Sequence, residues 1–313
     1  MKRILEKIEQ QIKADIYHGA SLALYDGMWQ EFYLGTQDGQ EAVVPGLTYD
    51  LASVSKVVGV GTVLIQMVKE GSIKLDLPLA AYYPDFTNHS VTIRQLLTHT
   101  SGINPYIPNR DKLNAKGLIE AINTIKATNQ HDFKYTDINF ILLGLMLENL
   151  TKQGLPDLFE QRVFKPFAMK ETSFGPVSVA VPTVKGVAPG VVHDPKAQIL
   201  GNHTGSAGLF STLKDLESFM TAYLQRDFAI YLNHNFAPSG SKERSLAWDK
   251  QGDWLLHTGY TGTFVLYNRK TQKAAIFLSN RTYEKDQRAQ WILDRDQLIT
   301  VIKEDLWCVM LYS

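Results

Sequence analysis

The sequence predicts an α+β fold in which one antiparallel sheet takes strands from both ends of the chain, is flanked by terminal helices, and carries an inserted, mainly helical lobe. Strand patterns lie near the N-terminus and again after residue 250, whereas helical patterns fill the middle. Such segregation is typical of α+β architectures. We therefore expect a sheet lobe formed by residues 1–74 and 205–313, a helical lobe formed by residues 75–204, and an active site at the interface of the two lobes.

The first 35 residues predict an amphipathic helix followed by a β-hairpin. Isoleucines recur at every fourth position from Ile4 to Ile16, which places them on one face of a helix. Two apolar runs, 20–25 and 29–34, then flank an Asp-Gly pair. This pair favours a tight turn because glycine readily adopts a positive φ. Residues 54–69 form a long apolar segment with few helix breakers, which predicts a buried helix that ends near Gly71.

The middle of the chain is rich in helical signals and poor in strand alternation. Residues 175–205 are dense in Gly, Pro and Val, and they predict a long irregular connection. The segments with helical patterns are 92–97, 115–128, 138–150 and 156–164.

The last third of the chain returns to strands. Thr212-Leu-Lys-Asp215 resembles a capping box ahead of a helix over 213–224. Residues 269–272 predict a turn between the last two strands, and an amphipathic helix over 292–311 closes the chain. The expected strands span 254–256, 263–268 and 274–279.

Composition excludes several classes of function. Lys+Arg and Asp+Glu both number 32, so the net charge is zero, which argues against a nucleic-acid partner. Cys308 is the only cysteine, which excludes an internal disulfide and a cysteine-based zinc site. The dinucleotide fingerprint G-x-G-x-x-G, the Walker A motif and H-E-x-x-H are all missing from the sequence. We therefore expect neither a cofactor nor a metal.

The sequence also predicts where the protein is located. Charged and amide side chains interrupt the apolar residues that follow the N-terminal Met-Lys-Arg, so a signal peptide is not expected. No apolar run of about 18 residues is evident, so no membrane span is expected. These observations favour the cytoplasm, or an extracytoplasmic location if a signal has already been removed.

Three Ser-x-x-Lys strings offer a nucleophile with a lysine on the same helical face. Such a lysine can accept the serine proton if burial or nearby positive charge keeps its amine neutral. Ser53 opens the long apolar helix, so Ser53 and Lys56 are the best placed pair. Ser211 stands where a helix cap is needed, and Ser239 lies in a flexible polar loop. The alternative for Ser53 is that it only caps its helix.

Two further groups complete a candidate site. Tyr135, in Tyr-Thr-Asp137, follows a polar loop and precedes an apolar helix, and it could relay a proton between nucleophile and leaving group. Thr136 or Asp137 could simply cap that helix. The string His257-Thr258-Gly259 directly follows an expected strand, and a glycine there lets substrate approach the backbone closely. The alternative for His257 is an ordinary loop histidine.

Together these strings resemble the serine β-lactamase and penicillin-binding-protein superfamily, and most closely the class C β-lactamase, D,D-peptidase and esterase branch. The matching text is LASVSKVVGVGTVLIQMVKEGSIKLDLPL, VTIRQLLTHTSGI, KYTDINFILLG, GSAGLFSTLKDL and HTGYTGTF, in family order over nearly the whole chain. The resemblance implies a β-lactamase/transpeptidase-like fold.

The resemblance also implies roles for single residues. Ser53 would be the acylated nucleophile, Lys56 its proton partner and Tyr135 the tyrosine of the second motif, with Asp137 where Asn is common. The backbone N–H groups of Ser53 and Tyr260 would form the oxyanion hole. The third motif would be formed by His257, Thr258 and Gly259. These three residues, together with Tyr260 and Asp137, would make the oxyanion and substrate contacts.

One departure from the family pattern bears on the substrate. His257 stands where β-lactamases usually carry lysine, which is similar to some peptidases and esterases and disfavours efficient β-lactam hydrolysis. A neutral imidazole binds a carboxylate less firmly than an ammonium does.

The sequence therefore favours a serine hydrolase that acts through an acyl-enzyme on a small-molecule or short peptide ester or amide. The alternatives are a D,D-carboxypeptidase or penicillin-binding protein, a weak class C-like β-lactamase, and a catalytically silent relative that binds a ligand. The oligomeric state and the natural substrate stay open.

Overall fold

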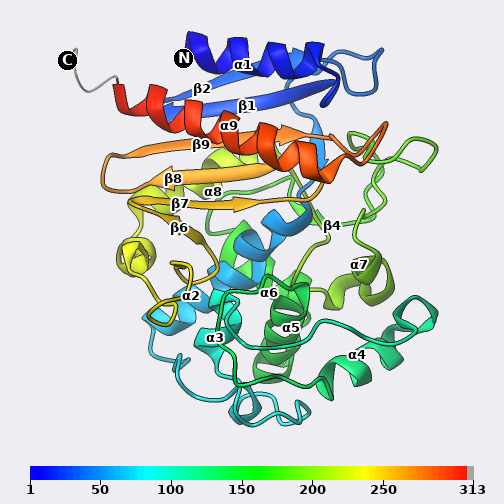
Figure 1. Cartoon of the computed structure of the whole chain (residues 1–313), viewed down its shortest axis with the longest axis vertical. Helices are drawn as coiled ribbons and strands as arrows, with labels where there is room; N and C mark the ends of the chain where they lie inside the picture. The colour runs from blue at the N-terminus through cyan, green and yellow to red at the C-terminus, as the bar shows by residue number, and fades with distance from the viewer. Residues whose placement is uncertain (309–313) are drawn as a thin grey trace.

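The computed structural model describes residues 1–308, and a six-stranded antiparallel sheet fills the upper half of Figure 1. The strand order is β2-β1-β9-β8-β7-β6, so the N-terminal hairpin pairs directly with β9 from the far end of the chain. The predicted α+β class is confirmed. The strands span Gly19–Asp26 (β1), Trp29–Gly35 (β2), Asp249–Gln251 (β6), Trp254–Thr258 (β7), Phe264–Asn268 (β8) and Lys273–Ser279 (β9).

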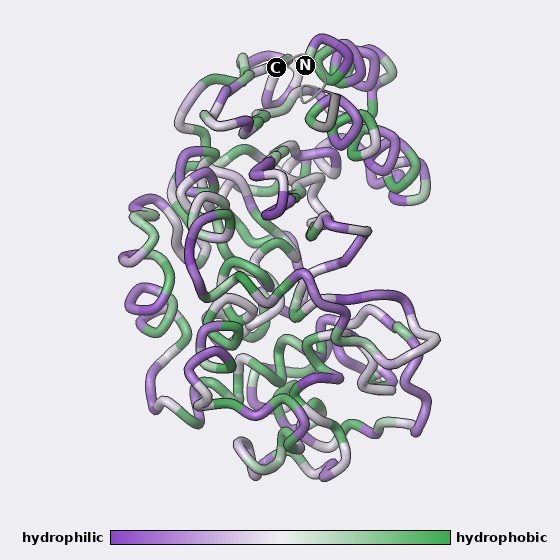
Figure 2. The backbone as a smooth tube through the Cα atoms, turned by 90° about the vertical axis from the view of Figure 1, so that its left-hand side faces the viewer, coloured by the Kyte–Doolittle hydropathy of each residue, from purple (hydrophilic) through white to green (hydrophobic). Residues whose placement is uncertain are grey.

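The two terminal helices, α1 (Lys2–Lys13) and α9 (Arg288–Cys308), lie side by side over one face of this sheet (Figure 1). Hydrophilic and hydrophobic residues alternate along both helices (Figure 2), because only one face of each packs on the sheet. Helix α9 begins four residues before the predicted start, and positions 309–311 of the prediction lie outside the described residues. The buried side chains between helices and sheet include Ile4, Ile8, Leu22, Leu24, Phe277 and Trp291.

Helix α8 (Leu213–Gln225) packs against strands of the same sheet, and a threonine caps its N-terminus. Thr212 Oγ1 accepts a hydrogen bond from the backbone N–H of Asp215 at 3.3 Å, as the sequence predicts. The prediction that Ser211 caps this helix is wrong, because the helix begins one residue later. Ser211 instead lies fully buried in strand β5 and hydrogen-bonds to the hydroxyl of Thr172.

The long apolar segment forms a continuous helical stretch from Ala52 to Lys69, but it is not one regular α-helix. A 3₁₀ turn (Ala52–Val54) and a π-helical segment (Val57–Gly61) precede α2 (Thr62–Lys69). By length and composition this stretch could span a membrane, so the prediction that no such run exists is wrong. Since 72% of the stretch is buried inside the protein, it is the core helix of the fold.

The lower half of Figure 1 is mainly helical, as predicted, and a single large apolar cluster joins it to the sheet. The predicted boundary between two lobes therefore stays an interpretation. One predicted helix is shorter than expected, since the segment 115–128 is helical only to Asn123, and the connection 175–205 contains a helix that the sequence did not predict. The helices span Ile93–Thr98 (α3), Ala115–Asn123 (α4), Asp137–Thr151 (α5), Leu155–Phe159 (α6) and Pro195–Leu200 (α7).

A small second sheet, which the sequence did not predict, stands beside the core helix. Its strands β3 (Thr48–Asp50), β5 (Leu209–Thr212) and β4 (Ser173–Phe174) are too short to show an alternating pattern. Strand β3 runs directly into the 3₁₀ turn that opens the core helix. The small sheet therefore fixes the residues just ahead of Ser53.

Candidate active site

Ser53 lies in the 3₁₀ turn that opens the core helix just after β3, and Asp50 shapes that turn. The backbone N–H of Ala52 donates to Asp50 Oδ1 at 2.8 Å, and Ala52 takes a left-handed φ of +45°. A left-handed conformation is costly for a residue other than glycine, so surrounding contacts must maintain it. Burial raises the pKa of Asp50 to about 6, against the opposing effect of its hydrogen bonds from His193 and Ala52. Ser53 remains partly exposed at this turn.

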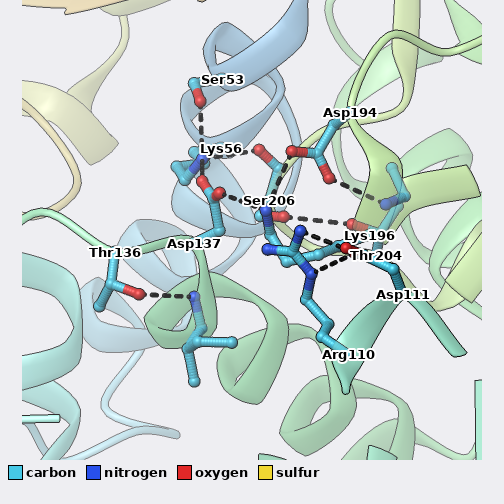
Figure 3. A network of polar contacts seen from close by, with 12 residues as sticks. Ser53, Lys56, Arg110, Asp111, Thr136, Asp137, Asp194, Lys196, Thr204 and Ser206 are labelled. Carbon is cyan, nitrogen blue, oxygen red and sulfur yellow. Dashed lines mark hydrogen bonds and ion pairs between the residues drawn. The ribbon is translucent and has the colours of Figure 1, made fainter. Parts of the chain in front are cut away.

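Lys56 points at Ser53 from one helical turn further along, as Figure 3 shows. Its side chain is completely buried, and its Nζ lies 2.8 Å from Ser53 Oγ. The same nitrogen donates to Asp137 Oδ1 at 2.7 Å and to the carbonyl oxygen of Ser206 at 2.8 Å. Three acceptors match the three protons of an ammonium group. This geometry makes Ser53 Oγ an acceptor from Lys56 and leaves the hydroxyl proton free for another partner.

The charge state of Lys56 follows from its surroundings. Burial alone would lower the pKa of its amine, but the adjacent carboxylate of Asp137, followed by Tyr135, raises that pKa above its ordinary value. Asp137 shows the matching change: burial opposes ionisation, yet the ammonium groups of Lys56 and Lys196 hold its pKa well below the usual range. The neutral amine that a direct proton acceptor requires is therefore not the resting form of Lys56.

Asp137 owes its place to the start of helix α5. Thr136 is the N-cap and accepts from the backbone N–H of Ile138 at 3.2 Å, so the cap role falls to Thr136 and not to Asp137. Asp137, in the first helical turn, is then free to receive two lysines. Its second oxygen lies 3.0 Å from the Nζ of Lys196. The structure thus places Asp137 between two lysines and in the wall of the second cavity, and its contact with a substrate stays a prediction.

Tyr135 directly precedes Thr136, the N-cap of helix α5. Its side chain is 42% exposed, and the Lys56 Nζ lies 5.2 Å from the centre of its ring. The buried ring of His99 backs it at a centroid distance of 4.4 Å. Two N–H groups donate to His99 Nδ1, from Thr136 at 3.4 Å and Asn139 at 3.2 Å. Tyr135 is therefore held from behind while its ring faces the cavity that Ser53 lines.

The third motif lies at the end of strand β7, against the turn that carries Ser53. A Cβ added to Gly259 would lie 2.1 Å from Thr263 Oγ1 and 2.6 Å from the carbonyl oxygen of Leu51. Thr263 Oγ1 donates to that same carbonyl at 3.0 Å, and Thr261 Oγ1 donates to the carbonyl of Asp50 at 2.9 Å. Only glycine lets strand and turn come this close.

His257 is buried beside the nucleophile and is neutral. It is 3% exposed, and neither ring nitrogen has a hydrogen-bond partner among the described residues. Burial, and then the charges of Lys56 and Arg244, lower its pKa well below the ordinary value. Its ring lies 6.4 Å from that of Tyr135, centroid to centroid. His257 thus forms an uncharged part of the wall of the cavity that Ser53 lines.

Tyr260 and Thr258 lie at the rim of the site. The Tyr260 side chain is 38% exposed, and its hydroxyl donates to the Asp286 carboxylate. The guanidinium of Arg281 lies 4.6 Å from its ring centre. Thr258 Oγ1 accepts from Arg295 at 3.4 Å, so a helix α9 arginine reaches the third motif.

Two cavities of about 480 and 490 Å³ open on either side of Ser53. Both are lined by Ser53, Tyr135, Tyr260 and Arg288, so a substrate can extend in two directions from the nucleophile. The first cavity is lined by six basic side chains and only two carboxylates, which favours an anionic group. Its basic residues are Lys242, Arg244, Arg281, Arg288, Arg295 and Lys303.

Of the three Ser-x-x-Lys strings, the structure joins only Ser53 and Lys56 by a hydrogen bond in its described part. Lys214 turns outward to Glu217 at 2.7 Å, and Lys242 pairs with Asp249 at 2.7 Å. Every residue that the sequence proposed for the site does gather around the two cavities or contacts a residue that lines them. The part that each plays in a reaction stays a proposal.

Sequence reasoning missed several residues of the site, among them Lys196, Arg244 and Arg288, the last of which lines both cavities. Lys196 lies in helix α7, whose start Asp194-Pro195 is a recognisable helix signal within the presumed irregular connection. Nothing in the sequence places its amine on Asp137. Arg244 comes from the loop ahead of β6, and no local pattern marked it. Within the described residues, no group of His, Cys, Asp or Glu side chains is arranged to hold a metal ion.

Comparison with known proteins gives concordant matches. A family model described as "Beta-lactamase" matches residues 5–299. The chain is 25% identical over 303 residues to a "Putative D-alanyl-D-alanine carboxypeptidase" of Escherichia coli (strain K12), covering 76% of this chain and 70% of the relative.

Two solved structures illustrate how similar the fold is. "EstCE1, a hydrolase with promiscuous acyltransferase activity" is 16% identical with a TM-score of 0.75, covering 95% of this chain and 97% of that one. A "Beta-Lactamase/D-Alanine Carboxypeptidase" from Pseudomonas syringae is 17% identical with a TM-score of 0.74, covering 94% and 97%.

Proposed function

Because the chain belongs to the Beta-lactamase family, we propose that it is a serine hydrolase in which an ester or amide acylates Ser53. The chain has the fold of the serine hydrolases of this family. The observation that carries the proposal is the buried Lys56, whose Nζ lies 2.8 Å from Ser53 Oγ where two cavities meet. A lysine placed in this way stabilises negative charge on the serine oxygen.

In the proposed acylation, Ser53 Oγ bonds to the substrate carbonyl carbon while Lys56 remains an ammonium. Tyr135 relays the proton: its oxygen takes the serine proton as its own proton passes to the leaving alcohol or amine. The carbon–leaving-group bond then breaks and an acyl-enzyme remains. Water releases the acyl group by the same steps in reverse, with Tyr135 returning a proton to Ser53.

The backbone N–H groups of Ser53 and Tyr260 form the oxyanion hole in this proposal. The N–H of Ser53 lies in the first turn of a helical stretch, where backbone donors have no partner within the helix. Ser53 and Tyr260 both line both cavities. In this proposal, a substrate carbonyl oxygen between the N–H groups of Ser53 and Tyr260 accepts a hydrogen bond from each as it becomes negative.

The experiment compares wild type with Ser53→Ala on a short-chain nitrophenyl ester and on a fluorophosphonate probe. We expect the variant to lose turnover and labelling, because the atom that forms the covalent bond is gone. Thermal unfolding serves as the control for folding. Retained turnover in Ser53→Ala would refute the mechanism.

A screen over esters, D-amino-acid amides and β-lactams identifies the class of substrate that the protein hydrolyses. The basic lining of the first cavity supports substrates with an anionic group, while the neutral His257 supports weak β-lactam turnover at most. The name of the Escherichia coli relative keeps a D-alanyl-D-alanine carboxypeptidase as the second candidate. Mass spectrometry after incubation with penicillin separates these: a long-lived adduct favours the penicillin-binding alternative, and rapid release favours a lactamase.

A catalytically silent relative is the alternative from another class. Two features would favour it, a Lys56 that points away from Ser53 and a blocked cleft. Lys56 instead contacts Ser53, and Ser53 lines both cavities. These observations support an active enzyme.

A further inference from the structure

Asp137 receives two lysines, one on each oxygen. Oδ1 lies 2.7 Å from the Nζ of Lys56, and Oδ2 lies 3.0 Å from the Nζ of Lys196 (Figure 3). We propose that Lys196 is a positioning residue for acylation: it binds the second oxygen of Asp137 and so fixes the carboxylate that holds Lys56 against Ser53. This role rests on the proposed function of Ser53.

A carboxylate held by one partner alone is poorly oriented, because the terminal torsion of aspartate is broad and roughly two-fold. Binding at both oxygens removes that freedom. The Oδ1 of Asp137 then points at Lys56 and accepts one of its three ammonium protons. The other two protons are donated to Ser53 Oγ and to the carbonyl oxygen of Ser206. Lys196 thus acts on the nucleophile through two intermediaries.

The fold holds Lys196 in place independently of the substrate. Its side chain is 13% exposed, and its Nζ lies 3.2 Å from Asp194 Oδ2. The other oxygen of Asp194 caps helix α7 by accepting from the backbone N–H of Ala197 at 2.9 Å. The preceding residue, His193, donates its backbone N–H to Asp50 Oδ2 at 2.8 Å. Asp50 also fixes the turn ahead of Ser53, so the lysine and the nucleophile share one anchor.

The alternative is that Lys196 only balances charge. Lys56, Asp137, Lys196 and Asp194 form an alternating chain with no net charge, and buried charges must be paired. A role in charge balance alone would lower stability when Lys196 is replaced but leave the labelling rate of the folded protein unchanged. A positioning role depends on Asp137, and a double-mutant cycle distinguishes the two.

The experiment measures the rate at which a fluorophosphonate labels Ser53 in the full chain, since labelling reports serine reactivity without turnover. We expect Lys196→Met to slow labelling by about tenfold to a hundredfold, the range for loss of a hydrogen bond between charged groups. Lys196→Arg should restore most of the rate. In the Asp137→Asn background, Lys196→Met should change the rate by no more than about twofold.

The matched control is Lys116→Met on helix α4, where the lysine is 85% exposed and forms an exposed ion pair with Glu120 at 3.9 Å. We expect this variant to label at the wild-type rate. Thermal unfolding of every variant shows whether the chain still folds.

Two outcomes would overturn the proposal while leaving the proposed function intact. One is wild-type labelling in Lys196→Met, and the other is an equal slowing by Lys196→Met with and without Asp137. A wild-type protein that the probe does not label at Ser53 would refute the proposed function and the role of Lys196 together.

Discussion

Replacing Asp137 by asparagine tests which form of Lys56 acts in the reaction. The substitution keeps the shape of the side chain and removes the charge that lies 2.7 Å from Lys56 Nζ. With charge centres roughly 4 Å apart and an effective dielectric constant near 20, the lost attraction is about 4 kcal/mol. That corresponds to about three pKa units. Burial, which already acts on Lys56 in the wild type, is then no longer opposed by that carboxylate, so the pKa of Lys56 falls below its ordinary value.

The assay is the pH dependence of kcat/KM for a short-chain nitrophenyl ester, corrected for spontaneous hydrolysis. If the ammonium form of Lys56 supports Ser53, Asp137→Asn loses activity with rising pH at least about two units earlier than wild type. If the neutral amine were instead the proton acceptor, activity would extend to lower pH and rise near neutrality. That second outcome would refute our reasoning. Asp85→Asn, at an exposed turn position, serves as the matched control.

The same variant should also be less stable, in a way that depends on pH. Losing the shared counter-ion leaves the ammonium groups of Lys56 and Lys196 with one carboxylate fewer, at a cost of about 3 kcal/mol at neutral pH. In wild type the raised pKa of Lys56 contributes stability that is lost only as pH rises through that pKa. In Asp137→Asn the pKa of Lys56 is lowered, so the difference in free energy of unfolding between variant and wild type should narrow as pH rises. Thermal unfolding at several pH values measures this difference.

Two further substitutions test the turn that carries Ser53. Gly259→Ala would put a methyl group 2.1 Å from Thr263 Oγ1, so we expect the rate of Ser53 labelling to fall at least about tenfold. The control is Gly117→Ala, whose nearest contact is 3.4 Å and which should not change that rate. Labelling of Gly259→Ala at the wild-type rate would contradict the close packing. The pKa of Asp50, raised by burial to about 6, means that wild-type stability falls as pH rises from about 4 to 6, by up to about 3 kcal/mol. Asp50→Asn should abolish that fall in thermal unfolding, and an unchanged pH dependence would show that Asp50 does not titrate there.

Local patterns in the sequence were enough to place most elements. The isoleucines of α1 and the Asp-Gly turn between β1 and β2 are short-range signals, and the structure follows them. The small sheet escaped prediction because β4 has only two residues and β3 only three, so pairing with β5 decides their conformation rather than any pattern of their own.

In the core helix, tertiary packing produces a conformation that the local sequence pattern alone does not predict. The sequence predicts one regular helix, yet its start contains a π-helical segment with Gly59 and Gly61. A Cβ at Gly59 would lie 2.4 Å from the ring of Phe159, and one at Gly61 would lie 2.8 Å from the Cβ of Ala247. These neighbours are far apart in sequence, so no periodicity could reveal them.

The sequence by itself determined the fold class, through the order of strand and helix patterns along the chain, and the pairing of Ser53 with Lys56, through their spacing on one helical face. Only the tertiary structure decided the charge of Lys56, since its partner Asp137 lies 81 positions away and brings Lys196 with it. Spacing can put a lysine beside a serine. Whether that lysine is an ammonium depends on which charges the fold gathers around it, because electrostatic energies follow distance in space and the burial of each group.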